Sequence, residues 1–306
     1  MKVLTSITHF KKIKKKVVLT IGVFDGLHIG HQHLIKKTVK LAKAIDGISV
    51  VFTFDTHPEK YLNEKNKIKI LKDTESKINR LKILGVDIVL IQNFKKIRYL
   101  SAKDFISKYI IKNINLYAIV TGKDFLFGKN KTGNISLLRR LSEKYKFKLL
   151  VIPDVKIENK KVSSTLIRKY LKAGKIKLVE KMLGGPYSIT GTVVHGRHIG
   201  FKYPTANIKL KYEDIPATGV WAVRVFYKDK SYLGAANIGT APTLKNEKKA
   251  LLEVYIYNFH KMIYGEKLRV VFLEKIRDEK KFKTQEELIK RVDKDIQFIK
   301  EKFGKP

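Results

Sequence analysis

The sequence predicts an α/β protein: a doubly wound parallel sheet, then a small antiparallel β-barrel domain with a C-terminal helix. Three observations lead to this prediction. In residues 1–183 short apolar runs alternate with amphipathic stretches, which is typical of parallel strands joined by crossover helices. After Gly184-Gly185-Pro186 apolar residues recur with a period of two in closely spaced runs, as in an antiparallel sheet or barrel. From Thr284 onward the spacing becomes helical.

Apolar runs in the first half are the predicted parallel strands. They are Val17–Phe24, Ser49–Phe54, Asp87–Gln92, Tyr117–Thr121 and Leu149–Ile152. Stretches with apolar residues three and four positions apart are the predicted helices between them: Gln32–Ile45, Thr74–Leu84, Ala102–Ile111 and Ser136–Lys144. Sheets of this kind bind ligands beyond the carboxyl ends of their strands, so we expect the site in the loops that follow the strands.

The run Gly184-Gly185-Pro186 is the predicted domain boundary, because glycine loosens the chain and proline cannot continue a helix. It separates a domain of residues 1–184 from a domain of residues 185–306. Alternating β-branched and aromatic residues predict the strands of the second domain: Tyr187–His195, Val220–Tyr227, Tyr232–Ile238, Leu251–Phe259 and Lys267–Leu273. The final helix begins at Thr284, with Glu287 in a capping box and an apolar stripe of Leu288, Val292, Ile296, Ile299 and Phe303.

Composition excludes several functional classes. The chain has no cysteine, which rules out disulfides and thiolate chemistry and fits a reducing, cytoplasmic location. No segment is long and apolar enough to span a membrane, and the run Val17–Phe24 lacks the features of a signal peptide. The net charge of +37 comes from lysines dispersed among acidic residues. Dispersed lysines indicate solvated faces rather than a specific nucleic-acid interface, and they attract anionic substrates such as ATP in a general way.

A glycine-rich turn joins the first predicted strand to a helix. It reads Gly22-Val23-Phe24-Asp25-Gly26-Leu27-His28-Ile29-Gly30-His31. Backbone N–H groups and the positive end of the helix can hold a phosphate there, and Gly30 lets a nucleotide approach closely. Imidazole donors from His28 and His31 would stabilise charge that develops when an ATP α-phosphate is attacked. The alternative is that either histidine only caps or packs at the helix start. We take Gly22, Phe24, Asp25 and Gly30 as candidate ATP-binding residues.

A second anion site is predicted where a later helix begins. Ser163, Ser164 and Thr165 offer hydroxyl and N–H groups, and Arg168 lies one turn further on, where it can make a bidentate phosphate contact. Simple N-capping is the alternative reading.

The string His28-Ile29-Gly30-His31 resembles the nucleotidyltransferase superfamily, which includes class I aminoacyl-tRNA synthetases as a competing reading. Three further segments, Thr53–Pro58, Gly122–Gly128 and Val162–Arg168, resemble the FAD synthetase domain of bacterial bifunctional riboflavin kinase/FAD synthetases in order and spacing. A Lys-Met-Ser-Lys-Ser-like loop, expected in a synthetase, is not visible. The resemblance covers residues 1–183 and implies an adenylyltransferase that makes FAD from FMN and ATP and releases pyrophosphate.

The same resemblance implies roles for the matched residues. Ser163, Ser164, Thr165 and Arg168 would hold the ATP β- and γ-phosphates. A flavin or adenine pocket would include Phe54, His57, Pro58, Asp124, Phe125 and Phe127. For the phenylalanines the alternative is core packing.

In the second domain, Pro204-Thr205-Ala206-Asn207 resembles the Pro-Thr-Ala-Asn motif of riboflavin kinases. The resemblance implies that Thr205 and Asn207 bind Mg²⁺ and ATP phosphates, a role suited to hard oxygen donors. It implies that Glu253 is the general base that accepts the proton of the riboflavin 5′-hydroxyl. Segments that begin at Asn237 and Arg277 also match, and these two residues are candidate flavin ligands.

Two departures bear on the kinase half. The stretch between Gly196 and Pro204 is shorter than the usual loop, and Asn258–Gly265 replaces the family's Asp-Phe-x-x-Asp-Leu-Tyr-Gly.

The leading interpretation is a bifunctional enzyme with ATP, riboflavin and FMN as small-molecule substrates, FAD as product and Mg²⁺ as cofactor. We expect no membrane or specific nucleic-acid partner, and weak self-association stays open. One alternative is an FAD synthetase whose kinase domain only binds flavin. The other is a nucleic-acid-binding protein on a nucleotidyltransferase scaffold.

Overall fold

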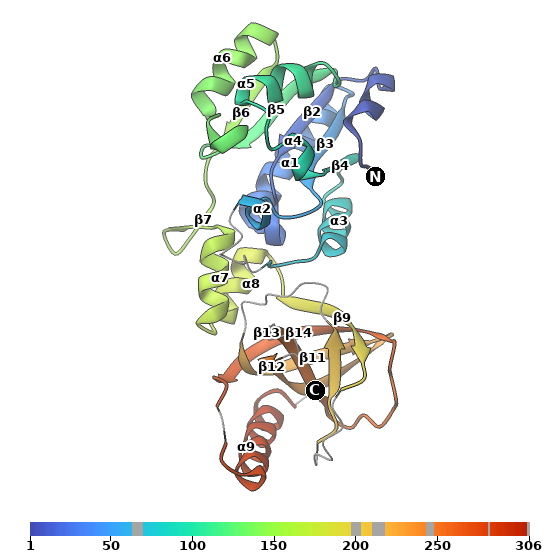
Figure 1. Cartoon of the computed structure of the whole chain (residues 1–306), viewed down its shortest axis with the longest axis vertical. Helices are drawn as coiled ribbons and strands as arrows, with labels where there is room; N and C mark the ends of the chain where they lie inside the picture. The colour runs from blue at the N-terminus through green and yellow to red at the C-terminus, as the bar shows by residue number, and fades with distance from the viewer. Residues whose placement is uncertain (63–69, 197–202, 210–217, 243–247, 281, 305–306) are drawn as a thin grey trace. The chain divides into compact units, whose positions relative to one another are not determined.

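A computed structural model describes residues 1–62, 70–196, 203–209, 218–242, 248–280 and 282–304 (Figure 1). The chain divides into two compact units, one of Met1–Ile68 with Lys72–Ser164 and the other of Lys69–Leu71 with Thr165–Pro306. Helices α7 (Ser164–Lys172) and α8 (Ile176–Leu183) precede the predicted boundary and group with the second unit, α7 from Thr165 onward. Among the described residues, no helix has the length and hydropathy needed to cross a membrane.

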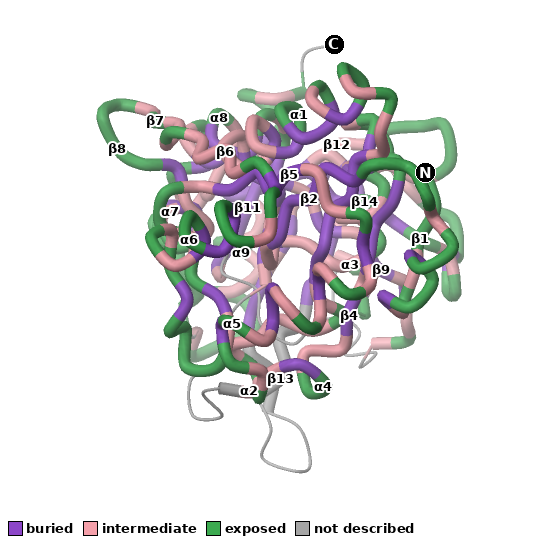
Figure 2. The backbone as a smooth tube through the Cα atoms, turned by 90° about the horizontal axis from the view of Figure 1, so that it is seen from above, coloured by how far each residue is buried: buried purple, intermediate pink, exposed green. Residues whose placement is uncertain are grey.

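The first unit is built on a parallel sheet with strand order β1-β4-β3-β2-β5-β6. The strands are β1 (Lys2–Leu4), β2 (Val17–Ile21), β3 (Ile48–Phe54), β4 (Ile88–Gln92), β5 (Leu116–Gly122) and β6 (Lys148–Ile152). The central strands are apolar on both sides because helices cover both faces, and β2 and β5 are drawn as buried in Figure 2. A short antiparallel pair, β7 (Lys156–Ile157) and β8 (Lys160–Lys161), follows.

Two sets of helices cover the two faces of this sheet. On one face lie α1 (Ile29–Ala44) and α3 (Thr74–Ile83), whose Ile35 and Leu81 are fully buried. The core of the other face includes residues of α5 (Ala102–Asp104), a π-helix η3 (Phe105–Ile111) and α6 (Ile135–Tyr145). Short helical turns complete the unit: η1 (Ile7–Lys12), η2 (Asp25–Leu27), α2 (Glu59–Leu62), α4 (Phe94–Ile97) and η4 (Lys129–Lys131). The predicted doubly wound sheet is confirmed.

The second unit contains a closed antiparallel barrel, in the order β10-β13-β12-β11-β14-β9. Its strands are β9 (Ser188–Val194), β10 (Ala206–Lys209), β11 (Gly219–Tyr227), β12 (Lys230–Pro242), β13 (Lys248–Ile256) and β14 (Lys267–Arg277). Trp221 and Phe272 are fully buried and meet edge to face at 5.5 Å. The predicted barrel is therefore confirmed.

Helix α9 (Gln285–Phe303) ends the chain as predicted. The Thr284 hydroxyl accepts a hydrogen bond from the Glu287 N–H at 3.2 Å, which is the expected N-cap. Ile296 and Ile299 are buried against Ala222 and Tyr257 of the barrel. The apolar stripe of this helix therefore faces the sheet.

Several predicted boundaries were wrong at the ends of elements. The first strand was expected to reach Phe24 but stops at Ile21, because Phe24 adopts a left-handed backbone with φ of 53°. Helix α1 was expected to begin at Gln32 but begins at Ile29, because the His28 side chain caps it. Strands β1 and β10 were missed. Both are short, and neither carries the repeated alternation on which the strand predictions depended.

Candidate active sites

The turn between β2 and α1 has an unusual backbone. Phe24, Gly26 and Leu27 have φ values of 53°, 74° and 42°, so two residues with side chains occupy a conformation that favours glycine. A Cβ on Gly22 would lie 2.9 Å from the Phe24 ring, which explains the glycine there. The Phe24 ring is buried and meets His31 edge to face at 5.3 Å. The backbone conformation of this turn therefore depends on the identity of its residues.

His28 and His31 stack on one another with ring centroids 3.6 Å apart and planes 18° from parallel. His28 Nδ1 accepts a hydrogen bond from the His31 N–H at 3.3 Å, which places the ring proton of neutral His28 on Nε2. A Cβ on Gly30 would approach the His28 ring to 3.2 Å, so glycine permits this close stack. Both predicted catalytic histidines are thus brought together at the start of α1.

Burial controls the protonation of this pair. Desolvation lowers the pKa of His28 to about 4, although its backbone hydrogen bond opposes the shift, and the charge of Lys161 lowers it further. Desolvation also holds the pKa of His31 well below its usual value, helped by the charges of His28 and Lys77. Both imidazoles are therefore neutral near pH 7, and neutral imidazole can donate one hydrogen bond to an oxyanion.

The predicted phosphate-binding segment begins beside the same turn. The Ser164 hydroxyl donates to the Asp25 carbonyl at 2.9 Å, and the Asp25 side chain is buried. Ser163 precedes α7, while Thr165 and Arg168 continue along that helix in the second compact unit. The structure therefore joins the start of this motif to the histidine turn.

Two lysines and two aspartates form an ion-pair network at the ends of β5 and β6. Lys161 pairs with Asp124 and, at 2.9 Å, with Asp154, which also contacts Lys123 at 3.0 Å. Burial works against the charge of Lys161, but its bonds to the two carboxylates outweigh this effect and raise its pKa. The network places Asp124, a candidate flavin ligand, next to a fixed positive charge.

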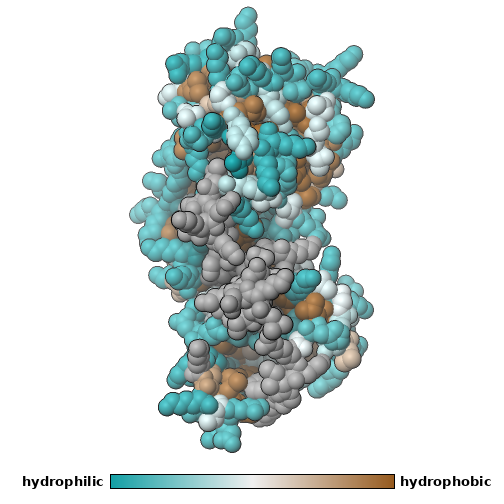
Figure 3. Space-filling model, viewed as in Figure 1, coloured by the Kyte–Doolittle hydropathy of each residue, from teal (hydrophilic) through white to brown (hydrophobic). Residues whose placement is uncertain are grey.

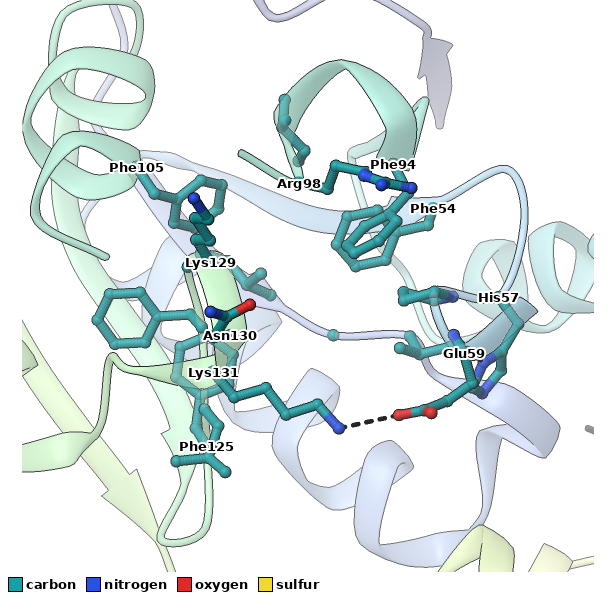
Figure 4. Close-up of a pocket in the computed structure, with 18 of the residues that line it drawn as sticks. Phe54, His57, Glu59, Phe94, Arg98, Phe105, Phe125, Lys129, Asn130 and Lys131 are labelled. Atoms are coloured by element: carbon teal, nitrogen blue, oxygen red, sulfur yellow. Dashed lines mark hydrogen bonds and ion pairs between the residues drawn. The ribbon is translucent and has the colours of Figure 1, made fainter. Parts of the chain in front are cut away.

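An apolar cavity of about 690 Å³ opens beside the turn and is shown in Figure 4. Phe54 and Phe94 meet edge to face at 5.4 Å, and Phe125 lies apart from them in the view. The cavity is lined by all candidate flavin residues of the first half: Phe54, His57, Pro58, Asp124, Phe125 and Phe127. The candidate ATP ligand Gly22 lines it as well. An aromatic lining of this size suits a large planar ring system.

Charged residues lie at the edge of the cavity. Lys131 of η4 pairs with Glu59 of α2 at 2.9 Å, the contact drawn as a dashed line in Figure 4. Lys129 and Arg98 also line the cavity. The cavity thus combines an apolar interior with basic groups that can attract an anionic ligand.

On the barrel, three candidate kinase residues form one row. Asn207 of β10 is directly opposite Glu253 of β13, and Glu253 is directly opposite Asn237 of β12. Their neighbours Ile208, Leu252 and Ile238 are buried in the interior, so the half-buried row lies on the outer face. A Cβ on Gly196 would be 2.0 Å from Asn207 Nδ2, which explains a glycine at that position. Thr205 is exposed just before β10.

Arg277, the remaining candidate, is held by α9. Its Nε donates to Asp295 at 2.7 Å, and Arg291 contacts the same carboxylate at 3.2 Å. The Asp295 side chain is only 4% exposed, so the pair is removed from solvent. This arrangement fixes the end of β14 to the helix.

The two departures from the kinase pattern fall in different parts of the chain. Of the shortened stretch between Gly196 and Pro204, residues 197–202 lie outside the described residues, and its last residue, Tyr203, contacts the Tyr255 ring with centroids 5.0 Å apart. In the altered segment, Phe259 packs edge to face on Tyr232 at 5.1 Å, and Tyr264 stacks on His195 at 3.8 Å.

Comparisons with known proteins match both halves of the chain. Residues 10–166 match the family model described as FAD synthetase, and residues 183–303 match the one described as riboflavin kinase. A bifunctional riboflavin kinase/FMN adenylyltransferase of Buchnera aphidicola subsp. Schizaphis graminum is 40% identical over 311 residues, 99% of each chain. The chain belongs to this bifunctional family. The Escherichia coli K12 member is 33% identical and covers 94% of this chain and 93% of its own.

A solved structure supports the fold of this family member. A crystal structure described as a macrolide-efflux protein from Streptococcus pneumoniae has a TM-score of 0.81 and 31% identity, and covers 97% of this chain and 98% of that one. Its description differs from the names of the curated relatives. The family models and those relatives agree with each other, and they set aside the aminoacyl-tRNA synthetase reading.

Sequence reasoning missed several side chains at and around the candidate site of the first unit. Phe94 and Phe105 line the cavity but lie in segments outside the recognised motifs. Lys77 and Lys161 act electrostatically on the histidines, yet nothing distinguishes them among the many lysines of the sequence. Only their position in the fold reveals them.

Proposed function

We propose that residues 1–184 transfer an adenylyl group from ATP to FMN and that residues 185–306 phosphorylate riboflavin. The observation that carries the first assignment is the stacked, neutral His28–His31 pair on a turn whose first residues, Gly22 and Val23, line an aromatic cavity of about 690 Å³. The second assignment rests on the row that Asn207, Glu253 and Asn237 form across three barrel strands. Family membership supports both.

In the adenylyl transfer, an oxygen of the FMN phosphate forms a bond to the α-phosphorus of ATP. The bond from that phosphorus to the bridging oxygen breaks, and pyrophosphate leaves. We assign His28 Nε2–H as a donor to the charge that develops on the α-phosphate, with His31 stacked behind it. Phe54 and Phe125 would hold the flavin ring in the cavity, and Ser163, Ser164, Thr165 and Arg168 would bind the departing phosphates.

In the kinase reaction, the 5′-oxygen of riboflavin attacks the γ-phosphorus of ATP and ADP leaves. We assign Glu253 as the acceptor of the hydroxyl proton, since it is a half-buried carboxylate that the strand register places between Asn207 and Asn237 and that remains open to substrate. Asn237 and Arg277 are the proposed flavin contacts.

The donor set of the kinase site fits Mg²⁺. Thr205 and Asn207 offer a hydroxyl and an amide oxygen, and Mg²⁺ retains waters and substrate phosphates rather than requiring a full protein cage. When bound, the ion would neutralise charge on the ATP phosphates.

Surface and composition support a proposal for the location and partners of the protein. Figure 3 shows hydrophilic side chains over much of the coloured surface of this view. Dispersed lysines with no cysteine support a cytoplasmic enzyme that acts on small anionic substrates, without a specific nucleic-acid interface.

Separation of the two activities tests the proposal. The protein is incubated with ATP, MgCl₂ and either riboflavin or FMN, and the flavins are resolved by chromatography. We expect FAD from both incubations, loss of FAD but not of FMN formation in a His28→Ala/His31→Ala variant, and the reverse pattern in Glu253→Gln. FAD from FMN alone in the unmodified protein would mean that the barrel only binds flavin, and no FAD from either incubation would refute the proposal.

A further inference from the structure

Helix α3 contacts the histidine turn through three side chains of different character. Leu81 is fully buried in the same apolar cluster as Phe24 and Leu27 of the turn. Lys77 and Arg80 lie three residues apart on the helix, so they project from one face. Lys77 contacts one side of the turn directly, and Arg80 reaches the other side through Gln32 of α1. None of the family motifs includes α3.

Lys77 binds the first side of the turn. Its ammonium donates to the Val23 carbonyl and to the Thr53 hydroxyl, both at 3.2 Å, and to the Phe54 carbonyl at 3.5 Å. An ammonium group has three N–H donors, and each of these acceptors can take one. Lys77 therefore joins the loop after β2 to the end of β3, and both Val23 and Phe54 line the cavity.

The second side of the turn is held through Gln32. Arg80 Nη2 donates to Gln32 Oε1 at 3.2 Å, and Gln32 Nε2 donates to the Leu27 carbonyl at 2.8 Å. Leu27 has a φ of 42° and directly precedes His28. The chain of bonds thus runs from α3 to the residue that sets the entry into α1.

This support matters because the turn is strained. Side-chain-bearing residues with positive φ persist only where the surrounding structure fixes them, and Phe24 and Leu27 are two such residues within four positions. Burial lowers the pKa of Lys77, while the Asp25 and Asp55 carboxylates oppose the shift. A half-buried lysine shared between the loop after β2 and the end of β3 is costly to place there, which argues for a specific task.

We propose that Lys77, assisted by Arg80, is a positioning residue for adenylyl transfer: it fixes the histidine pair relative to the flavin cavity. The inference rests on the proposed adenylyltransferase function. FMN and ATP must meet between the cavity and the histidines, so a shift of the turn would separate the reacting groups. Misplacement by about 1 Å can cost about 10²-fold in rate.

The test compares Lys77→Met with Lys82→Met, which removes an exposed lysine from the same helix. FAD formation from FMN and ATP gives kcat and both KM values, and quenching of flavin fluorescence gives the FMN dissociation constant. Riboflavin phosphorylation by the same preparations checks the other unit. We expect Lys77→Met to lower kcat for FAD formation about 10- to 100-fold, with smaller changes in FMN affinity and unchanged kinase activity, and Lys82→Met to match the unmodified protein.

Thr53→Val provides a second, milder variant if Lys77→Met does not fold. It removes one acceptor of Lys77 and the hydrogen bond that the Thr53 hydroxyl itself donates to the Val23 carbonyl at 3.1 Å, with little change in volume. Because Lys77 keeps its two carbonyl acceptors, we expect a smaller loss in the same kinetic constant. Unchanged kcat in a folded Lys77→Met or Thr53→Val variant would overturn the inference, and so would weaker FMN binding at unchanged kcat. Absence of FAD formation by the unmodified protein would instead refute the proposed function itself.

Discussion

Replacement of His28 by asparagine should remove part of the acid sensitivity of the first unit. Asparagine is a good N-cap, so it can still accept the hydrogen bond from the His31 N–H but does not titrate. Burial lowers the pKa of His28 from 6.5 to about 4. Between pH 6.5 and pH 4, His28 therefore binds a proton in the unfolded chain but not in the folded protein. The stability present at neutral pH is lost as the pH falls from 6.5 toward 4, which is the sign expected for a depressed histidine.

The size of this effect follows from the shift. Each pH unit of pKa difference corresponds to about 1.36 kcal/mol, so between pH 7.5 and pH 5 His28 alone should cost the unmodified protein about 2 kcal/mol of unfolding free energy. Its side chain is largely buried, so solvent screening reduces this figure little. The pKa of His31 shifts in the same direction, partly through the charge of His28, so the comparison with His28→Asn gives the part due to His28 together with its coupling to His31.

The assay must report on the first unit. The sole tryptophan, Trp221, lies in the barrel, so its fluorescence follows the second unit and serves as an internal control. Amide hydrogen exchange of peptides from β2 and α1 at both pH values gives the opening free energy of the first unit, with His9→Gln as an exposed-histidine control. Equal losses on acidification in His28→Asn and the unmodified protein would refute the reasoning from burial. The variant should also form FAD about 10²-fold more slowly at pH 7.5, because it lacks the Nε2–H donor.

Three further outcomes are expected in the second unit. Glu253→Gln should lower riboflavin phosphorylation by about 10²- to 10⁴-fold while FAD formation from FMN continues, measured by chromatography; an active kinase would exclude Glu253 as general base. Gly196→Ala should reduce kinase activity, because its Cβ would lie 2.0 Å from Asn207 Nδ2; ATP affinity and kcat equal to the unmodified protein would contradict that crowding. Asp295→Ala should destabilise the barrel by about 3 kcal/mol, since it leaves the largely covered guanidinium of Arg277 without its buried partner. Trp221 fluorescence in urea measures the change, and an unchanged midpoint would show that solvent compensates.

Local patterns in the sequence were enough to predict the elements and the motifs within them. Apolar runs such as β3 are buried on both faces of the sheet and can be read without tertiary information. The end of β2 could not be read in this way, because Phe24 is an apolar residue that continues the pattern but turns away with a positive φ. Likewise, the predicted start of α1 was too late. His28 was interpreted as a catalytic group, but its ring also caps the helix, which therefore begins at Ile29.

The arrangement of the first site is explained by strand order, which periodicity does not give. Strand β2 lies between β3 and β5, so the loops that follow these three strands meet at one end of the sheet. After β2 the chain adds β3 and β4 on one side of that strand, and it then adds β5 and β6 on the other side. The strand order therefore reverses beside β2. Ligands of doubly wound sheets bind at such a reversal. The cavity accordingly takes Val23 from the loop after β2, Phe54 from the end of β3 and Phe125 from the loop after β5. A sequence pattern can identify each loop, but only the pairing of β2 with both neighbours unites the aromatic cavity with the histidine pair.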